Sequence, residues 1–173
     1  MSVHRIDARL SLATSIDEAW SFFADPHNLA LITPPELGFE FNSGVPARMY
    51  AGLMLAYTVR PLLGVPLQWL TEITHVEEGR YFVDQQRSGP YRLWHHQHHF
   101  LAVGGGVEMR DILHYELPFG IAGDAIDQLF VRSRVDRIFD YRREVLTARF
   151  GELAGIGRPT GVPSAIAGSN GAR

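Results

Sequence analysis

The stretch that decides the fold is Tyr91-Arg92-Leu93-Trp94-His95-His96-Gln97-His98-His99-Phe100-Leu101. A β-strand sends alternate side chains to opposite faces. One face of a strand over these residues therefore carries Trp94, His96, His98 and Phe100, and the other carries His95, Gln97 and His99. Because aromatic residues lie at both ends of the even-numbered set, we expect that set to face the protein interior.

A second strand is expected over residues 107–117, after a Gly104-Gly105-Gly106 turn. Its alternation puts a mainly apolar set on a single face, with Asp111 as the polar member, namely Val107, Met109, Asp111, Leu113, Tyr115 and Leu117. If one strand shifted by one residue relative to the other, all its apolar side chains would point outward. The requirement that both apolar faces point inward therefore limits the register in which the two strands can pair. A tight turn at the glycines then pairs His98 with Asp111, Trp94 with Tyr115, and Phe100 with Met109.

The expected pair of His98 and Asp111 is unusual for an inner sheet face. Both groups are polar and titratable, and the residues around them are aromatic or aliphatic. An unpaired buried charge is too costly to keep, so both groups need partners. We infer that they border a cavity and that the interior is not a solid core.

Length and composition predict a single soluble domain. The chain has 173 residues, of which 46% are hydrophobic. A net charge of −3 offers no basic surface to nucleic acid, and the lack of cysteine excludes disulfides, thiolate metal ligands and a cysteine nucleophile. No stretch has the ~20 apolar residues of a membrane span. We therefore expect a cytoplasmic protein with no membrane span, and the oligomeric state stays open.

The remaining patterns predict further strands and two short helical segments around this hairpin. Ser15 and Glu18 have the spacing of a capping box, so a helix is expected over residues 16–24. A brief second turn is expected over 27–31, after Pro26. Strands are expected over 3–13, 36–41, 53–60, 67–76 and 81–87, which makes about seven in an antiparallel meander.

A long helix is expected over about 123–150. Its apolar stripe comprises Ile126, Leu129, Phe130, Val135, Ile138, Phe139, Val145 and Leu146. Its arginines are expected to form a solvated face, namely Arg132, Arg134, Arg137, Arg142, Arg143 and Arg149. The tail over 152–173 is rich in Gly, Ala, Pro and Ser, and we expect it to be disordered.

This order of elements resembles the helix-grip fold of the START-like superfamily, also called SRPBCC. The resemblance covers roughly residues 3–151 and is nearest to the uncharacterised bacterial polyketide cyclase/dehydrase-like branch. It rests on Ala19-Trp20, Phe22-Phe23, Asp25-Pro26-His27-Asn28-Leu29, Ile32-Thr33-Pro34-Pro35, Phe82-Val83-Asp84-Gln85, Gly89-Pro90-Tyr91, Trp94, His96, His98, Phe100, Asp111, Tyr115 and Leu117-Pro118-Phe119-Gly120.

The resemblance implies an α+β helix-grip domain over residues 1–151. In such a domain a curved antiparallel sheet wraps around the C-terminal helix and leaves a pocket for a small hydrophobic ligand. The resemblance brings with it no catalytic residue, no cofactor and no metal.

The candidate site lies on the inner faces of the sheet. The expected ligand-binding residues are Trp69, Asp84, Trp94, His96, His98, Phe100, Met109, Asp111 and Tyr115. The direction in which Asp84 faces stays open, because the Gly89-Pro90 loop leaves its register undetermined. His98 and Asp111 are also the candidate catalytic pair, since a carboxylate partner raises the basicity of a histidine.

Two histidines and a carboxylate also match a metal triad of His96, His98 and Asp111. We favour a hydrogen-bonded polar pair without a metal or cofactor. Three functions then remain. The favoured one is binding of a small hydrophobic ligand. The others are a polyketide cyclase or dehydratase that uses the His-Asp pair, and an accessory or interaction protein with a vestigial pocket.

Overall fold

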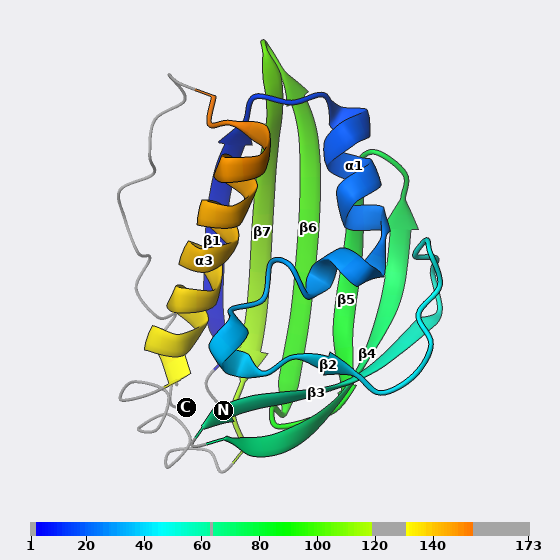
Figure 1. Cartoon of the computed structure of the whole chain (residues 1–173), viewed down its shortest axis with the longest axis vertical. Coiled ribbons are helices and arrows are strands. Elements are labelled where there is room, and N and C mark those ends of the chain that lie inside the picture. The colour runs from blue at the N-terminus through cyan, green and yellow to red at the C-terminus, as the bar shows by residue number, and fades with distance from the viewer. Residues whose placement is uncertain (1–2, 63, 119–130, 154–173) are drawn as a thin grey trace, which may run out of the picture.

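A seven-stranded antiparallel sheet forms the body of the protein (Figure 1). The computed structural model describes residues 3–62, 64–118 and 131–153. Within them the strands are β1 (His4–Leu12), β2 (Glu40–Phe41), β3 (Leu53–Leu62), β4 (Val65–Glu77), β5 (Tyr81–Ser88), β6 (Leu93–Val103) and β7 (Gly106–Glu116). Their order is β1-β7-β6-β5-β4-β3-β2, a meander from β2 to β7 that β1 extends at the β7 edge. The predicted α+β class and strand count are confirmed.

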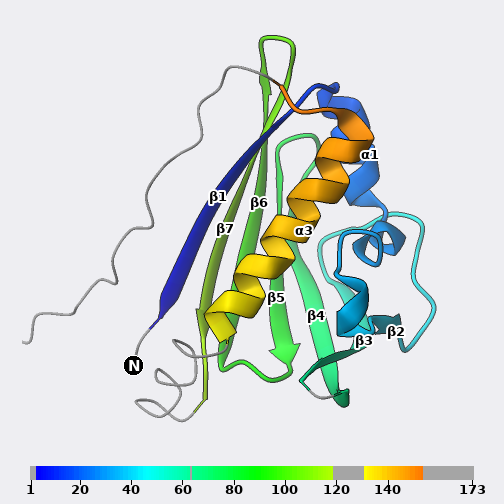
Figure 2. The ribbon, with the colours of Figure 1, turned by 60° about the vertical axis from the view of Figure 1, so that its left-hand side comes forward.

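The helices cover one face of this sheet, as Figure 2 shows. They are α1 (Ile16–Ala24), the 3-10 helices η1 (Pro26–Leu29) and η2 (Pro35–Leu37), and α3 (Arg132–Phe150). α3 crosses the concave face beside β1 and β7, whereas α1 and η1 lie over the other side of that face. Among the described residues, no helix is both long and apolar enough to cross a membrane.

The first helix follows its sequence signal. The backbone N–H of Glu18 donates to the side-chain oxygen of Ser15 over 3.2 Å, which satisfies a donor at the helix start. α1 has the predicted bounds. The expected long helix is confirmed over 132–150, but Ile126, Leu129 and Phe130 of its stripe lie outside the described residues.

The strand expected over residues 36–41 is wrong over most of its length. Pro35–Leu37 forms η2, and Gly38 follows in the left-handed region with φ of 50°. Proline fixes φ near −65° and removes a ladder donor, so Pro34 and Pro35 favour a helical turn at this point. Only Glu40 and Phe41 pair with β3.

The β6-β7 hairpin has the predicted register. His98 pairs with Asp111, Trp94 with Tyr115, and Phe100 with Met109. Gly105 suits the tight turn, and Gly106 lets β1 approach the hairpin closely. Gly105 has φ of 83°, and a side chain at Gly106 would collide with the backbone carbonyl of Leu12 on β1.

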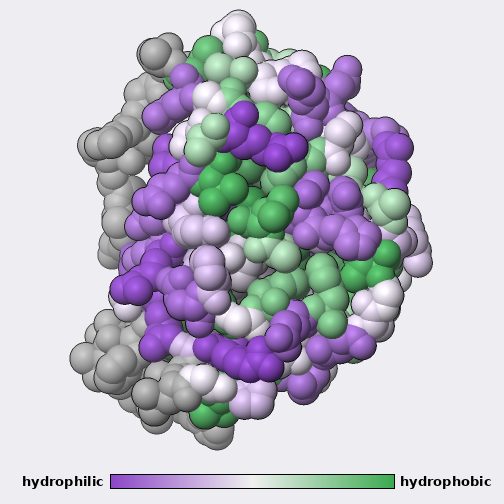
Figure 3. Space-filling view, in the orientation of Figure 1, coloured by the Kyte–Doolittle hydropathy of each residue, from purple (hydrophilic) through white to green (hydrophobic). Residues whose placement is uncertain are grey.

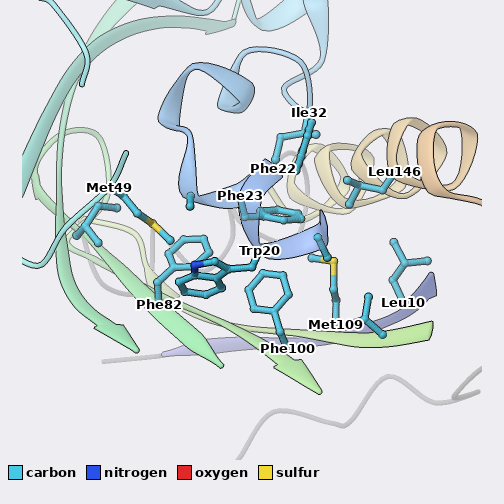
Figure 4. Close-up of a cluster of buried hydrophobic side chains, with 14 of the residues drawn as sticks. Leu10, Trp20, Phe22, Phe23, Ile32, Met49, Phe82, Phe100, Met109 and Leu146 are labelled. Atoms are coloured by element: carbon cyan, nitrogen blue, oxygen red, sulfur yellow. The ribbon is translucent and has the colours of Figure 1, made fainter. Parts of the chain in front are cut away.

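An aromatic core packs between α1 and the sheet (Figure 4). The rings of Trp20 and Phe23 pack edge-on against Phe100 of β6, with centroids 5.5 and 5.2 Å apart. Leu12 and Leu146 are fully buried in the same cluster. Phe100 is therefore a core residue under α1.

The chain keeps its contact with the sheet just past α3. The N–H of Leu153 donates to the carbonyl of Ser11 over 3.0 Å, and Glu152 forms a bridge with Leu12. Glu152 and Leu153 thus add to the edge of β1, although the sequence places them in the tail. The rest of that predicted tail, residues 154–173, lies outside the described residues, and the domain boundary stays a prediction.

Two residues of α3 are expected to differ in their contribution to stability. Leu146 is 0% exposed, so Leu146→Ala should lower the free energy of unfolding by ~2–5 kcal/mol. Ile138 is only half-buried and lines a cavity, so Ile138→Ala should cost less than the ~2 kcal/mol at the bottom of that range. Urea denaturation measures both. Equal costs would mean that no open space adjoins Ile138.

Candidate functional site

A cavity of about 500 Å³ lies between the concave face of the sheet, the η1 region and α3. Its wall is mostly apolar, with residues from α1, η1, β3, β4, β5, β6 and α3. Figure 3 shows hydrophobic surface gathered in the middle of the face that carries α1 and α3, with hydrophilic groups around it. The sequence-based expectation of a cavity next to the histidines therefore agrees with the structure.

Three neighbouring strands bring polar side chains together in one wall of this cavity. Asp84 of β5 is paired with His96 of β6, and His98 of β6 is paired with Asp111 of β7. His96 and His98 are each 4% exposed, and Asp111 is 6% exposed. Asp84, whose direction the sequence left open, points inward and lines the cavity. We call these four residues and Arg142 of α3 the buried polar cluster.

Asp84 and Asp111 lie on opposite sides of the two imidazoles. His98 Nε2 donates to Asp84 Oδ2 over 2.8 Å, and its Nδ1 lies 2.7 Å from Asp111 Oδ1. His96 Nε2 lies 3.1 Å from the same Asp111 oxygen, and its Nδ1 lies 3.7 Å from Asp84 Oδ2. Each histidine thus has one nitrogen toward Asp84 at the cavity and the other toward Asp111 beneath.

Ring packing fixes the orientation of both imidazoles. His98 is stacked on Phe82 with centroids 4.1 Å apart, and the two histidine rings are 3.9 Å apart. Phe139 of α3 lies 5.7 Å from His96. Side chains held on several sides keep their geometry when a ligand arrives, which favours binding.

Arg142 corrects the expectation that the arginines of the last helix form a solvated face. It is 9% exposed, it lines the cavity, and its Nη1 lies 3.5 Å from Asp111 Oδ1. A signal for this burial was present in the sequence. Arg142 follows Val135 by seven residues, and this spacing puts both on one helix face. The side chain then reaches into the protein to meet the buried carboxylate.

The buried polar cluster is balanced in charge. Burial disfavours the imidazolium form of His98, but the carboxylates of Asp111 and Asp84 outweigh burial and raise the pKa of His98. Burial also favours neutral Asp111, yet the charge of His98 and the neighbouring His96 and Arg142 lower the pKa of Asp111 well below its usual range. Asp84 is likewise held ionised, chiefly by the hydrogen bond from His98 against the effect of burial. Two anions therefore face two cations.

His96 is the neutral member of the cluster. Burial and the nearby charge of His98 lower the pKa of His96 to about 4. The pKa values of the two histidines are therefore expected to be shifted in opposite directions from the ordinary value. Between pH 4 and 6.5 His96 should stay neutral, and His98 should keep its proton above pH 6.5.

The sign of the stability effect differs between these histidines. The pKa of His96 is lower in the folded than in the unfolded protein, so His96 destabilises the fold as the pH falls below 6.5. The pKa of His98 is raised in the folded protein, so the stability that His98 contributes is lost as the pH rises through its folded-state pKa. Nitrogen chemical shifts in NMR spectra recorded over this pH range report each ring separately. Titration of both rings together near 6.5 would contradict the assignment.

The other predicted ligand-binding residues divide into two groups. Trp69 and Trp94 line the cavity, with ring centroids 5.1 Å apart in an edge-on arrangement. Phe100, Met109 and Tyr115 lie in the buried clusters and are not among the lining residues. Asp111 also lies behind the wall, in contact with His96, His98 and Arg142, which line the cavity. The interpretation of His95 and His99 as outward-facing agrees with their bonds to Gln85 and Gln97.

Sequence reasoning did not find every polar group of the wall. The hydroxyl groups of Tyr57 on β3 and Thr71 on β4 lie 3.0 Å apart inside the cavity. Burial raises the pKa of Tyr57 far above its ordinary value, so Tyr57 stays neutral. The weak alternation over residues 53–60 hid the inward direction of Tyr57, whereas Thr71 shares one face of the strand expected over 67–76 with Trp69.

Comparison with solved structures identifies the fold of this chain. A START superfamily protein from Mycobacterium smegmatis superposes with a TM-score of 0.63 at 14% identity, covering 85% of this chain and 97% of that one. The chain has the helix-grip fold of that protein. This fold is also that of a protein from Thermus thermophilus, with TM-score 0.64, 17% identity and coverage of 84% and 99%. A major latex-like protein of Panax ginseng has TM-score 0.63, 12% identity and coverage of 87% and 99%.

The helix-grip assignment rests on structure alone. No protein-family model and no curated protein sequence matches the chain. At identities of 12–17%, the structural neighbours show the fold and its elements. Function has to be argued from the site itself.

Proposed function

We propose that the protein binds one small, mainly apolar ligand in the cavity between the sheet and α3. The form of the cavity carries this proposal, because about 500 Å³ of space has a mostly apolar wall with one buried polar cluster. Ligand pockets have volumes of about 300–1,000 Å³ and combine an apolar lining with a few polar groups that fix orientation. The resemblance to helix-grip proteins that bind hydrophobic ligands supports the same function.

The aromatic side of the wall favours a ring-containing or lipid-like ligand. The Tyr57 and Trp69 rings are stacked with centroids 5.9 Å apart, and Trp94 stands edge-on to Trp69. Such faces contribute large apolar contact areas. A ligand between this aromatic wall and the residues of η1 would be removed from water on several sides.

Unpartnered donors in the wall favour a ligand with an oxygen acceptor. Trp69 Nε1 is buried and has no hydrogen-bond partner within the described part of the chain, and the same holds for Arg142 Nε. A buried donor left unsatisfied costs about 1–3 kcal/mol. A side-chain rotation that turned either donor into the cavity would let a carbonyl, hydroxyl or carboxylate of the ligand supply the missing acceptor.

The test is titration with the fluorescent dye anilinonaphthalene sulfonate, which combines an aromatic ring system with an acidic group. We expect saturable binding of one dye per chain and a rise in emission. Displacement by a fatty acid or by an uncharged polycyclic aromatic compound then ranks the two ligand classes. A native protein that gives no saturable signal and no displacement with either class would contradict the proposal.

A second candidate is a polyketide cyclase or dehydratase, and the ionisation of the two histidines supports it. A neutral His96 beside a protonated His98 supplies a base and an acid at one wall, as paired acid-base chemistry requires. Asp111→Asn discriminates between the roles with a polyketide-like substrate. A catalytic cluster predicts loss of turnover with little loss of affinity, and a cluster that only orients the ligand predicts loss of affinity.

A further inference from the structure

We propose that Asp84, His96 and His98 bind a divalent first-row metal ion such as Zn²⁺ in the cavity wall. One ligand atom from each of the three lies within 4.8 Å of the others. This inference goes beyond binding of an apolar ligand. It also differs from the triad considered from the sequence, in which Asp111 supplied the carboxylate.

The spacing of the ligand atoms suits a metal after small side-chain rotations. His98 Nε2 and His96 Nδ1 lie 2.8 and 3.7 Å from Asp84 Oδ2. Zinc binds nitrogen and carboxylate oxygen at about 2.0–2.2 Å in tetrahedral geometry, which puts neighbouring ligand atoms roughly 3–3.5 Å apart. The separations of 2.8 and 3.7 Å fall on either side of this range.

Asp111 occupies the position of an orienting carboxylate. Its Oδ1 lies 2.7 Å from His98 Nδ1 and 3.1 Å from His96 Nε2, the two nitrogens that face away from Asp84. Metal-bound histidines almost always pair their second nitrogen with a carboxylate or carbonyl, which fixes the tautomer. One carboxylate oxygen thus lies beside the second nitrogen of both imidazoles, while the other nitrogen of each ring faces Asp84.

The site leaves room for a further ligand. Asp84, His96 and His98 all line the cavity, and the Asp84 side chain keeps 17% of its surface exposed. Three protein ligands with an open fourth position are typical of zinc sites that meet substrate. Two imidazoles and one carboxylate also suit other first-row ions. Because all three residues line the cavity, an oxygen of a ligand bound there would be able to complete the coordination of the metal.

Calorimetric titration of chelator-treated protein with Zn²⁺ tests the proposal. We expect saturable binding of one ion per chain. Asp84→Asn and His96→Gln should each weaken binding by more than the ~10–100-fold that loss of an orienting partner costs, and Asp111→Asn should fall within that range. His99→Gln is the matched control, because His99 lies on the same strand with its side chain on the outer face, and its affinity should equal that of the native protein.

Native protein without saturable Zn²⁺ binding would overturn the proposal, and so would His99→Gln lowering affinity as much as Asp84→Asn does. Circular dichroism checks that each variant is folded. If Asp84→Asn does not fold, Co²⁺ bound to native protein decides, because tetrahedral nitrogen and oxygen coordination gives intense visible absorption and hydrated Co²⁺ does not. The dye titration uses no metal, so the two proposals succeed or fail separately.

Discussion

Asp111→Ala should lower the free energy of unfolding by ~3–5 kcal/mol, the cost of removing one partner from a buried group of charges. Asp111 is 6% exposed and lies within 3.5 Å of His98, His96 and Arg142. Without its carboxylate, the Arg142 guanidinium and the His98 imidazolium remain buried with only Asp84 to balance them. Urea denaturation at neutral pH measures the loss.

Glu108→Ala is the matched control on the same strand. Glu108 pairs with Arg9 over 3.0 Å on the outer face, where the side chains of Glu108 and Arg9 are 16% and 44% exposed. An ion pair at the surface contributes ~0.2–1 kcal/mol, so this variant should lose far less stability than Asp111→Ala. If the two variants lost similar amounts of unfolding free energy, the buried polar cluster would contribute no more to stability than a surface ion pair does.

As the pH falls, the difference in folding stability between native protein and Asp111→Asn should become smaller. The pKa of Asp111 is lowered in the folded state, so its contribution to stability is complete above the unfolded value of 3.8 and is lost as the pH falls through the folded value. His96, His98 and Arg142 are the charged or titratable groups that face it. A difference in stability that grew with acid would reverse the assigned direction.

Leu67→Trp should reduce dye affinity at least tenfold, which corresponds to ~1.4 kcal/mol of binding free energy. Leu67 of β4 is half-buried and lines the cavity. The larger indole would take space that the ligand needs, while the half-buried position limits the strain on the core.

Leu101→Trp is the matched control for Leu67→Trp. Leu101 lies on β6, is 61% exposed and does not line the cavity. Its affinity for the dye should match that of native protein. If both variants bind the dye as tightly as native protein does, the dye site lies elsewhere on the molecule.

The hairpin and the first helix could be predicted because their signals are local. Alternation of aromatic residues determined which face of β6 is buried, and the glycine turn fixed the pairing of His98 with Asp111. Ser15 and Glu18 marked the start of α1. In each case the deciding residues lie within a few positions of one another or across one tight turn.

The composition of the cavity wall depends on contacts between elements that are far apart in the sequence, so it was harder to predict. Alternation places Phe100 and His98 on one face, but only the position of α1 makes Phe100 core, whereas His98 borders open space. The direction of Asp84 depended on register across the Gly89-Pro90 loop. Arg142 was assigned to solvent by its charge, although its spacing from Val135 placed it on the buried face of α3.

Native mass spectrometry of the protein purified from its own host tests the central claim most directly. We predict a chain that carries one small apolar molecule in a one-to-one ratio, with the same molecule retained by Leu101→Trp and lost from Leu67→Trp. A bare chain mass for native protein, with no molecule released on denaturation, would contradict the claim that this cavity holds a ligand and would favour an accessory protein with a vestigial pocket.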